Sequence, residues 1–362
     1  MKNPIAKKAA IGMGIFILVV IFLMIIASCS SNKKYTYKEL ENKMVSLAKQ
    51  KYNDDSLLPK ENGGSLEVSL QSFVDEGSLK NIQDIVENNS VCSGHVQIIN
   101  NNNNYLYLPF LNCGADYKTK TLYDILTENT VTSGNGLYLD NNEYIFKGDN
   151  VNNHLMIGDT KFRIIKINND GTIKAIDTTK RELKPWDDRY NIETNINDGY
   201  NDYIFNGIDS RIKELIDSYY NDENIISSNI KPYFKTQNLC IGKRSATEFI
   251  NDGSIECSKT IENQIFGLIQ VNEYFKATLD SNCNKIESDS CSNYNYLANL
   301  SNTWTITADK DTTYRVYKLS YGSITLAKAN VSSPSLITVR LDKNIVIDEG
   351  NGSEDNPYKI NI

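Results

Sequence analysis

The chain has 362 residues, of which 40% are hydrophobic and 23% are charged, and its formal net charge is −7. This balance is typical of a protein with a packed core and excludes wholesale disorder. The acidic excess, with no basic run along the chain, also argues against nucleic acid or a polyanionic wall polymer as a bulk electrostatic partner.

The N-terminal segment predicts a membrane tether. Residues 9–28 are uncharged and follow Lys2, Lys7 and Lys8. A helix of about 20 apolar residues crosses the hydrocarbon core of a bilayer, and lysines ahead of it hold the N-terminus in the cytoplasm. The rest of the chain is therefore expected outside the cytoplasmic membrane, with a formal charge of −10 once these three lysines are left out.

Two fates of this segment remain open. Ala27 and Ser28 stand directly before Cys29, as small residues do in a lipoprotein signal whose cleavage leaves a lipidated cysteine. The alternative is an uncleaved signal anchor, and the length of the apolar run favours it, because cleaved signals have apolar stretches of roughly 7 to 15 residues. Both alternatives leave the protein attached to the membrane.

The segment after the tether predicts two helices. Thr36 and Glu39 fit a capping box, and apolar residues then recur at helical spacing as far as Tyr52. A second, short helix is expected to begin after Ser69 and to end at Gly77. Glycine suits this end because it readily adopts the left-handed conformation of a helix C-terminal cap.

Six cysteines beyond the tether predict three disulfides. The first pair follows from a hairpin: strand-like runs at 96–99 and 105–111 flank five asparagines. If the turn is centred on this loop, Cys92 and Cys113 face each other, at the separation of about 4.5 to 5.5 Å that a disulfide tolerates. An even number of cysteines is also typical of an exported protein.

The other four cysteines are paired by proximity in the chain. Cys283 and Cys291 close a short loop, which leaves Cys240 and Cys257 by elimination. Zinc is the alternative use of such residues, but zinc sites favour closer cysteine pairs or histidine partners. We therefore expect no metal at these cysteines.

The region around residue 130 is expected to separate two domains. A short helix is predicted over 121–126, and the stretch 127–136 that follows is polar and contains glycine. The sequence therefore predicts a tether over 1–30, a first domain over 31–130 and a second domain over 131–362.

Strand patterns dominate the second domain. Tight hairpins are expected around 140–143 and 168–171, and helices are expected after Asp209 or Ser210 and over 272–279. The tail returns to strands at 314–320, 323–327, 336–341 and 345–347. This mixture predicts an α+β fold with a twisted antiparallel sheet at its centre.

The first domain resembles the type IV pilin and pseudopilin plan. The features that carry the resemblance are a helix close behind a membrane span, a loop with Leu58-Pro59, the run SLQSFVDEGSLKN at 69–81 and a disulfide-linked hairpin. The chain lacks the GFTLxE-type processing sequence of true pilins. The resemblance implies a stalk or an envelope-assembly component.

The second domain is similar to surface modules of low-GC Gram-positive bacteria. The resemblance is carried by YIFKG at 144–148, FRIIKI at 162–167, WDDRYN at 186–191, SRIKELI at 210–216, LCIGKR at 239–244 and the closing glycine, proline and tyrosine motif at 350–358. It implies a membrane-anchored surface protein with a divergent C-type-lectin-like fold, and no reaction is attached to it.

Candidate chemical groups are few, and no catalytic or cofactor motif is present. A Ser-His or Cys-His nucleophile would need His95 or His154. The acid pairs at 54–55 and 187–188 could serve glycoside cleavage, but adjacent acids on loops are usually solvated surface. Oxygen-bearing residues at 348–355 could hold calcium, although the glutamate-proline-asparagine signature of sugar-binding lectin loops is missing. We expect no cofactor and no metal.

The two tryptophans, Trp186 and Trp304, could each stack on a sugar ring. Trp304 lies in the alternating run TWTIT and is expected in the core. Trp186, between Pro185 and Asp187, is the candidate for a ligand-binding residue at the surface.

Two functions from different classes remain open. The favoured one is a non-enzymatic cell-surface protein, tethered through 9–28, whose first domain acts as a stalk and whose second domain binds a glycan or a surface protein. The rival is an extracytoplasmic hydrolase of envelope polymers, which would need two facing carboxylates in a cleft. A pseudopilin-like role in envelope assembly is a third alternative.

Overall fold

The computed structural model describes residues 34–179, 182–248, 253–283, 286, 291, 293–300 and 302–360. The predicted tether at 9–28 and the lipidation site at Cys29 lie outside the described residues. Across the ranges that are described, no helix is both long and apolar enough to cross a bilayer.

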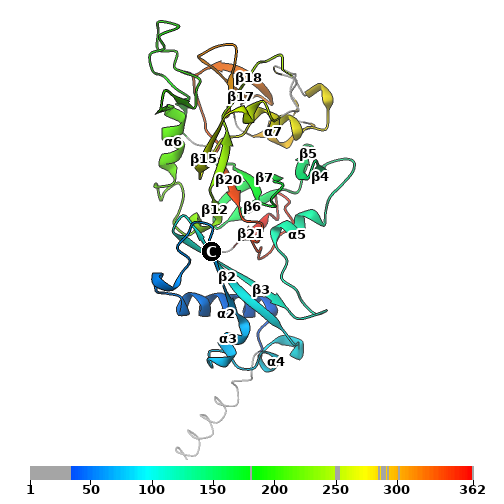
Figure 1. The fold of residues 1–362 in the computed structure, drawn as a ribbon. Coiled ribbons are helices and arrows are strands. Elements are labelled where there is room, and N and C mark those ends of the chain that lie inside the picture. Colours follow the sequence, from blue (N-terminus) through cyan, green and yellow to red (C-terminus); the bar gives the residue numbers. More distant parts are fainter. Residues whose placement is uncertain are drawn as a thin grey trace, which may run out of the picture. The chain divides into compact units, whose positions relative to one another are not determined.

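The chain is α+β, its sheets are mostly antiparallel, and it divides into two compact units (Figure 1). Among the described residues, the smaller unit takes in 34–53 with Val68–Val96 and Pro109–Lys118. The larger unit takes in Asp54–Glu67, Gln97–Leu108 and Thr119–Ile362. Residues 127–136, where the sequence predicts a boundary, lie within the larger unit.

The long helix of the smaller unit is α2 (Tyr37–Lys51), and its capping box is confirmed. Thr36 Oγ1 accepts a hydrogen bond from the N–H of Glu39, whose carboxylate accepts one from the N–H of Thr36. The apolar face of the helix, including Leu40 and Met44, is buried. The helical periodicity of the apolar residues and the capping box therefore predicted the position of this helix correctly.

Two shorter helices complete the smaller unit. The helix α3 (Leu70–Asp75) has Ser69 as its N-cap and is followed by Gly77 at φ +75°, as the sequence predicts. The helix α4 (Ile82–Ile85) follows and is capped by Asn81.

A three-stranded sheet contains the asparagine hairpin, drawn in cyan in Figure 1. Its strands, in spatial order, are β1 (Ser65–Ser69), β2 (Ser93–Asn101) and β3 (Asn104–Asn112). Asn102 and Asn103 have φ of 54° and 62°. Two successive residues with positive φ make the tight turn that matches the twist of a hairpin, and asparagine tolerates this conformation well.

The main sheet of the larger unit has eight strands. Six of them run in the order β12-β20-β8-β7-β5-β4; β6 pairs with β7, and β21 pairs with β6. Their bounds are β4 (Gly136–Asp140), β5 (Glu143–Lys147), β6 (His154–Ile157), β7 (Thr160–Ile167), β8 (Ile173–Asp177), β12 (Phe234–Lys235), β20 (Thr338–Leu341) and β21 (Tyr358–Ile360). Pairing is antiparallel except between β21 and β6. Both predicted hairpins, β4–β5 and β7–β8, are confirmed.

A second sheet has the order β14-β16-β17-β18, and the remaining strands form two-stranded pairs. The bounds are β14 (Lys243–Arg244), β16 (Thr303–Asp309), β17 (Arg315–Ser320) and β18 (Ser323–Lys328), then the pairs β13 (Gln237–Cys240) with β15 (Thr260–Gln264), β9 (Lys184–Pro185) with β19 (Ser332–Ser333), and β10 (Ile204–Phe205) with β11 (Ile208–Asp209). The helices of this unit are α5 (Leu122–Thr127), α6 (Arg211–Tyr219) and α7 (Val271–Lys276), close to the three predicted positions.

One predicted strand, at 345–347, is wrong. In the structure Val346 makes only an isolated bridge to Thr121. The N–H groups of Asn344 and Ile345 both bond back to Asp342, through its side chain and its carbonyl. A turn held by an aspartate replaces the strand, because such short side chains compete for backbone N–H groups.

Candidate functional site

Three cationic side chains stand in a line across the main sheet. Arg340 in β20 is the direct cross-strand partner of Lys174 in β8, and Lys174 is the partner of Lys166 in β7. Directly opposed residues project from the same face of a sheet, so these three share one face. We call them the cation row. Like charges placed side by side repel, and the row therefore needs acidic partners.

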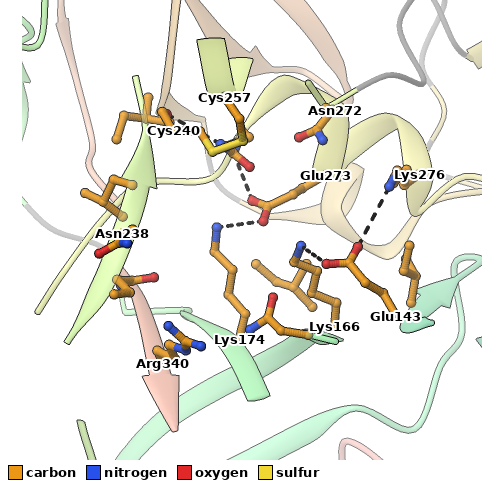
Figure 2. A pocket seen from close by; sticks show the side chains of 18 of the residues that line it. Glu143, Lys166, Lys174, Asn238, Cys240, Cys257, Asn272, Glu273, Lys276 and Arg340 are labelled. Carbon is orange, nitrogen blue, oxygen red and sulfur yellow. Dashed lines mark hydrogen bonds and ion pairs between the residues drawn. A yellow bond between two sulfur atoms is a disulfide. The ribbon is translucent and has the colours of Figure 1, made fainter. Parts of the chain in front are cut away.

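The cation row lines a cavity of about 560 Å³ inside the larger unit (Figure 2). The helix α7 contributes Asn272, Glu273 and Lys276 to its wall, and β5 contributes Glu143. The strand β13 contributes Asn238 and Cys240, the latter joined to Cys257 by a disulfide. The volume is in the range of about 300 to 1,000 Å³ that is usual for small-ligand sites.

Glu273 provides the deepest acidic partner. Its carboxylate lies 2.6 Å from the Lys174 ammonium, and the two side chains are only 3% and 10% exposed. The second carboxylate oxygen accepts a hydrogen bond from the N–H of Gln270, at 3.0 Å, which fixes the side chain at the start of α7. Lys174 itself projects from β8, in which every residue is buried. The buried charge is therefore tolerated because its partner is rigidly placed.

Glu143 and Asp170 balance the rest of the row. The Glu143 carboxylate lies 2.8 Å from the Lys166 ammonium and 3.9 Å from that of Lys276. Dashed lines mark both pairs in Figure 2. Arg340 pairs with Asp170 and donates from Nε to Thr172 Oγ1 at 2.7 Å. Each carboxylate of the cavity is thus engaged by at least one cation.

The ionised state of Glu273 makes the stability of the larger unit depend on pH. Burial alone would raise the pKa of this carboxyl, but Lys174, Lys166 and the Gln270 N–H hold it below its ordinary value. A carboxyl with a lowered pKa in the folded state stabilises the fold above its unfolded pKa, near 4.5, and this contribution is lost as the pH falls below that value.

We expect Glu273→Gln to lower the free energy of unfolding by about 1 to 3 kcal/mol at pH 7, because a neutral amide replaces a charged acceptor. The difference from the wild type should shrink as the pH falls below 4.5, because the carboxyl of the unfolded wild type takes up a proton there while the folded carboxyl, with its lowered pKa, is still ionised. Urea unfolding at pH 7 and at about pH 3.5 measures both values. An equal difference at the two pH values would contradict this role of the charge.

The two histidines do not converge on the cavity. His95 lies in β2 and stacks on Phe110, with ring centroids 5.0 Å apart. His154 lies in β6, where burial and the nearby Arg163 lower its pKa to about 4. Among the described residues that line the cavity there is no histidine.

The acid pairs singled out in the sequence have structural partners. Asp187 is fully buried and binds Arg189 at 2.8 Å, whereas Asp188 is largely exposed and lies 3.5 Å from Arg211. Asp54 accepts the N–H of Ser56 and caps a single turn. Over the described ranges, 348–355 included, no group of three or more histidine, cysteine, aspartate or glutamate side chains could hold a metal ion.

The expectation that Trp186 lies at the surface is wrong. Its side chain is 0% exposed, and its ring packs against Trp304 and Tyr203, with centroids 6.2 and 5.9 Å away. The preceding residues, Lys184–Pro185, form β9 and pair with β19, which turns the tryptophan inward. Trp186 therefore cannot stack on a ligand at the surface. Trp304 is buried, as predicted.

The three disulfides join Cys92 to Cys113, Cys240 to Cys257 and Cys283 to Cys291, the pairs that the sequence favours. The Cα atoms of Cys92 and Cys113 are 4.1 Å apart, beside the asparagine hairpin. Three disulfides are typical of an extracellular or secreted protein, because thiols stay reduced in the cytosol. One of them, Cys240–Cys257, also forms part of the cavity wall.

Sequence reasoning missed the cavity and its charged residues. A signal was present: Lys166 and Lys174 each stand inside an apolar strand run, FRIIKI and TIKAI, and Arg340 stands in TVRL. In a sheet with one face in water such residues are ordinary outward-facing positions. Their alignment depends on the register between β20, β8 and β7, which the sequence does not reveal.

Comparisons with known proteins give no match: no family model, no curated protein and no solved structure is similar to this chain. The functional argument therefore rests on the geometry of the cavity.

Proposed function

We propose that the protein is a membrane-tethered, extracytoplasmic binding protein and that the cavity of the larger unit is its binding site. The observation that carries this proposal is a ligand-sized polar cavity whose carboxylates are all held by cations. Fixed, paired charges orient a ligand without being consumed or titrated. The ligand is a glycan, or a group on a surface protein, of a size that the cavity admits.

The ion-paired carboxylates of the cavity fit a binding site better than the active site of a hydrolase. A glycoside hydrolase needs one carboxyl that stays protonated to act as general acid, and its pKa must be raised for this purpose. The pKa of Glu273 is held below its ordinary value instead, as its lysine neighbours require. The two cysteines of the cavity are joined in a disulfide and offer no thiolate.

The cellular setting that we propose follows from the sequence. Residues 9–28 would anchor the chain in the cytoplasmic membrane, either as a signal anchor or with Cys29 lipidated after cleavage. The disulfides support an extracytoplasmic position for both units. In this proposal the smaller unit is a pilin-like stalk and the larger unit is a divergent C-type-lectin-like module.

The test is a substitution that fills the cavity. Asn238 is exposed at the cavity wall, so Asn238→Trp should block the site and leave the core intact. We expect the full chain in nanodiscs to bind a subset of a glycan array and Asn238→Trp to reduce this binding at least tenfold.

A matched control is Leu139→Trp, which places the same side chain at a position of β4 that is 62% exposed; neither Leu139 nor its cross-strand partner Tyr144 lines the cavity. It should bind as the wild type does. If Asn238→Trp and Leu139→Trp bind every glycan equally well, or if the wild type binds nothing on the array, the proposed function is wrong.

A further inference from the structure

The cavity carries an excess of positive charge in a protein that is acidic as a whole. Its lining contains four cationic side chains and three acidic ones: Lys166, Lys174, Lys276 and Arg340 against Glu143, Asp170 and Glu273. The local balance is +1, whereas the chain carries −7. Complementary charge is what a binding site offers its ligand, so the balance favours an anion with a single charge.

The excess charge lies at Lys276. Lys166 and Lys276 share the Glu143 carboxylate, and Lys166 is the nearer, at 2.8 Å. The Lys276 ammonium lies 3.9 Å from the same carboxylate, beyond hydrogen-bonding distance. Its N–H groups are therefore not taken up by Glu143, and its side chain is 24% exposed. A ligand carboxylate placed between Lys276 and Lys166 would accept hydrogen bonds that Glu143 cannot.

The uncharged part of the lining suits a sugar. Amide side chains donate and accept hydrogen bonds as hydroxyl groups require, and the cavity has six of them: Asn168, Asn169, Gln237, Asn238, Gln270 and Asn272. Three of the six, Asn168, Gln237 and Gln270, already donate to backbone carbonyls. Apolar side chains lie beside them and can pack against the C–H groups of a sugar ring: Ile145, Ile165, Leu239, Leu268 and Ile306.

We infer that the cavity binds a terminal sugar residue that carries one carboxylate, such as a uronate or a sialate, with the carboxylate against Lys276. This inference rests on the proposed binding function. A free amino acid fits less well, because its own ammonium would restore the positive excess. A phosphate dianion would over-compensate a balance of +1. A long polyanion would be repelled by the −10 of the exported chain, whereas a single acidic end can enter.

Calorimetric titration of the full chain in nanodiscs tests the inference. The probes are glucuronate and N-acetylneuraminate, compared with glucose, glucose 6-phosphate and glutamate. We expect at least one of the two acidic sugars to bind about tenfold or more tightly than glucose, and this preference to weaken as salt is raised. Glucose 6-phosphate and glutamate should bind more weakly than that acidic sugar.

Three variants locate the charge. Lys276→Gln should weaken binding of the acidic sugar about tenfold, and Lys276→Arg should retain it, which separates loss of charge from misfolding. Glu143→Gln, which raises the local balance to +2, should strengthen binding severalfold. The matched control is Lys120→Gln, which removes the same charge from a lysine that is 53% exposed, pairs with Glu128 and lies outside the cavity lining. This control should leave the affinity for the acidic sugar unchanged.

The outcomes separate the two proposals. Glucose binding as tightly as the acidic sugars, with no effect of Lys276→Gln, overturns the ligand class but leaves a binding function in place. Tighter binding of glucose 6-phosphate than of the acidic sugars also overturns the proposed ligand class and indicates a phosphorylated ligand instead. If none of the five probes binds while Asn238→Trp still abolishes glycan-array binding, the ligand class is wrong and the site is right.

Discussion

Replacing Glu256 by alanine is expected to lower the free energy of unfolding by about 3 to 5 kcal/mol. The Glu256 carboxylate lies 3.0 Å from the guanidinium of Arg244, and both side chains are 0% exposed. The same carboxylate oxygen accepts the N–H of Asn272, at 3.0 Å, in the helix that forms part of the cavity wall. Removing it leaves a buried guanidinium without its carboxylate, which is far more costly than losing an exposed ion pair.

A double variant is the control for this prediction. Arg244→Met with Glu256→Leu removes both charges and fills the space with apolar atoms, so it should be more stable than Glu256→Ala alone. Urea unfolding followed by circular dichroism compares the two. If Glu256→Ala costs less than about 1 kcal/mol, the pair is not buried as the structure has it.

Replacing Trp186 by alanine is the second large effect, with an expected cost of about 3 to 5 kcal/mol. The indole is fully buried between Trp304 and Tyr203, and its removal leaves a cavity that these rings cannot fill. Thermal melting measures the loss. The nearby Tyr190 is 54% exposed, and Tyr190→Ala should change the stability by no more than about 0.5 kcal/mol.

This experiment also separates the core position of Trp186 from the ligand-stacking role that its sequence context favoured. A stacking residue at the surface would lose ligand binding on substitution and keep normal stability. Trp186→Ala with an unchanged melting temperature would therefore contradict the buried position.

Features set by neighbouring residues could be predicted from the sequence. The cap at Thr36, the left-handed Gly77 and the asparagine turn at 102–103 all depend on groups within a few positions of one another. The disulfide from Cys92 to Cys113 followed from that turn, because a hairpin centre fixes which residues face each other.

Features set by distant segments could not be predicted. Trp186 is flanked by Pro185 and Asp187, a context typical of a surface loop, and it is buried because β9 pairs with a strand almost 150 residues later. The cation row needs the register of three strands, one of them more than 160 residues from the others. The polarity of neighbouring residues indicates only whether a side chain can be exposed to solvent. Whether it is buried depends on pairing with strands that are distant in the sequence.

The central claim, that the charged cavity is the binding site, is tested most directly by methyl NMR of the full chain in nanodiscs, labelled at isoleucine and titrated with glucuronate and with N-acetylneuraminate. Ile145, Ile165 and Ile306 line the cavity, whereas Ile212 and Ile216 lie buried in α6, outside the cavity lining. The account predicts that the sugar that binds shifts the methyl signals of the first three and leaves those of the other two in place. No shift at saturating concentrations of both sugars would overturn the ligand class alone, whereas shifts confined to isoleucines outside the cavity would contradict the claim that the cavity is the binding site.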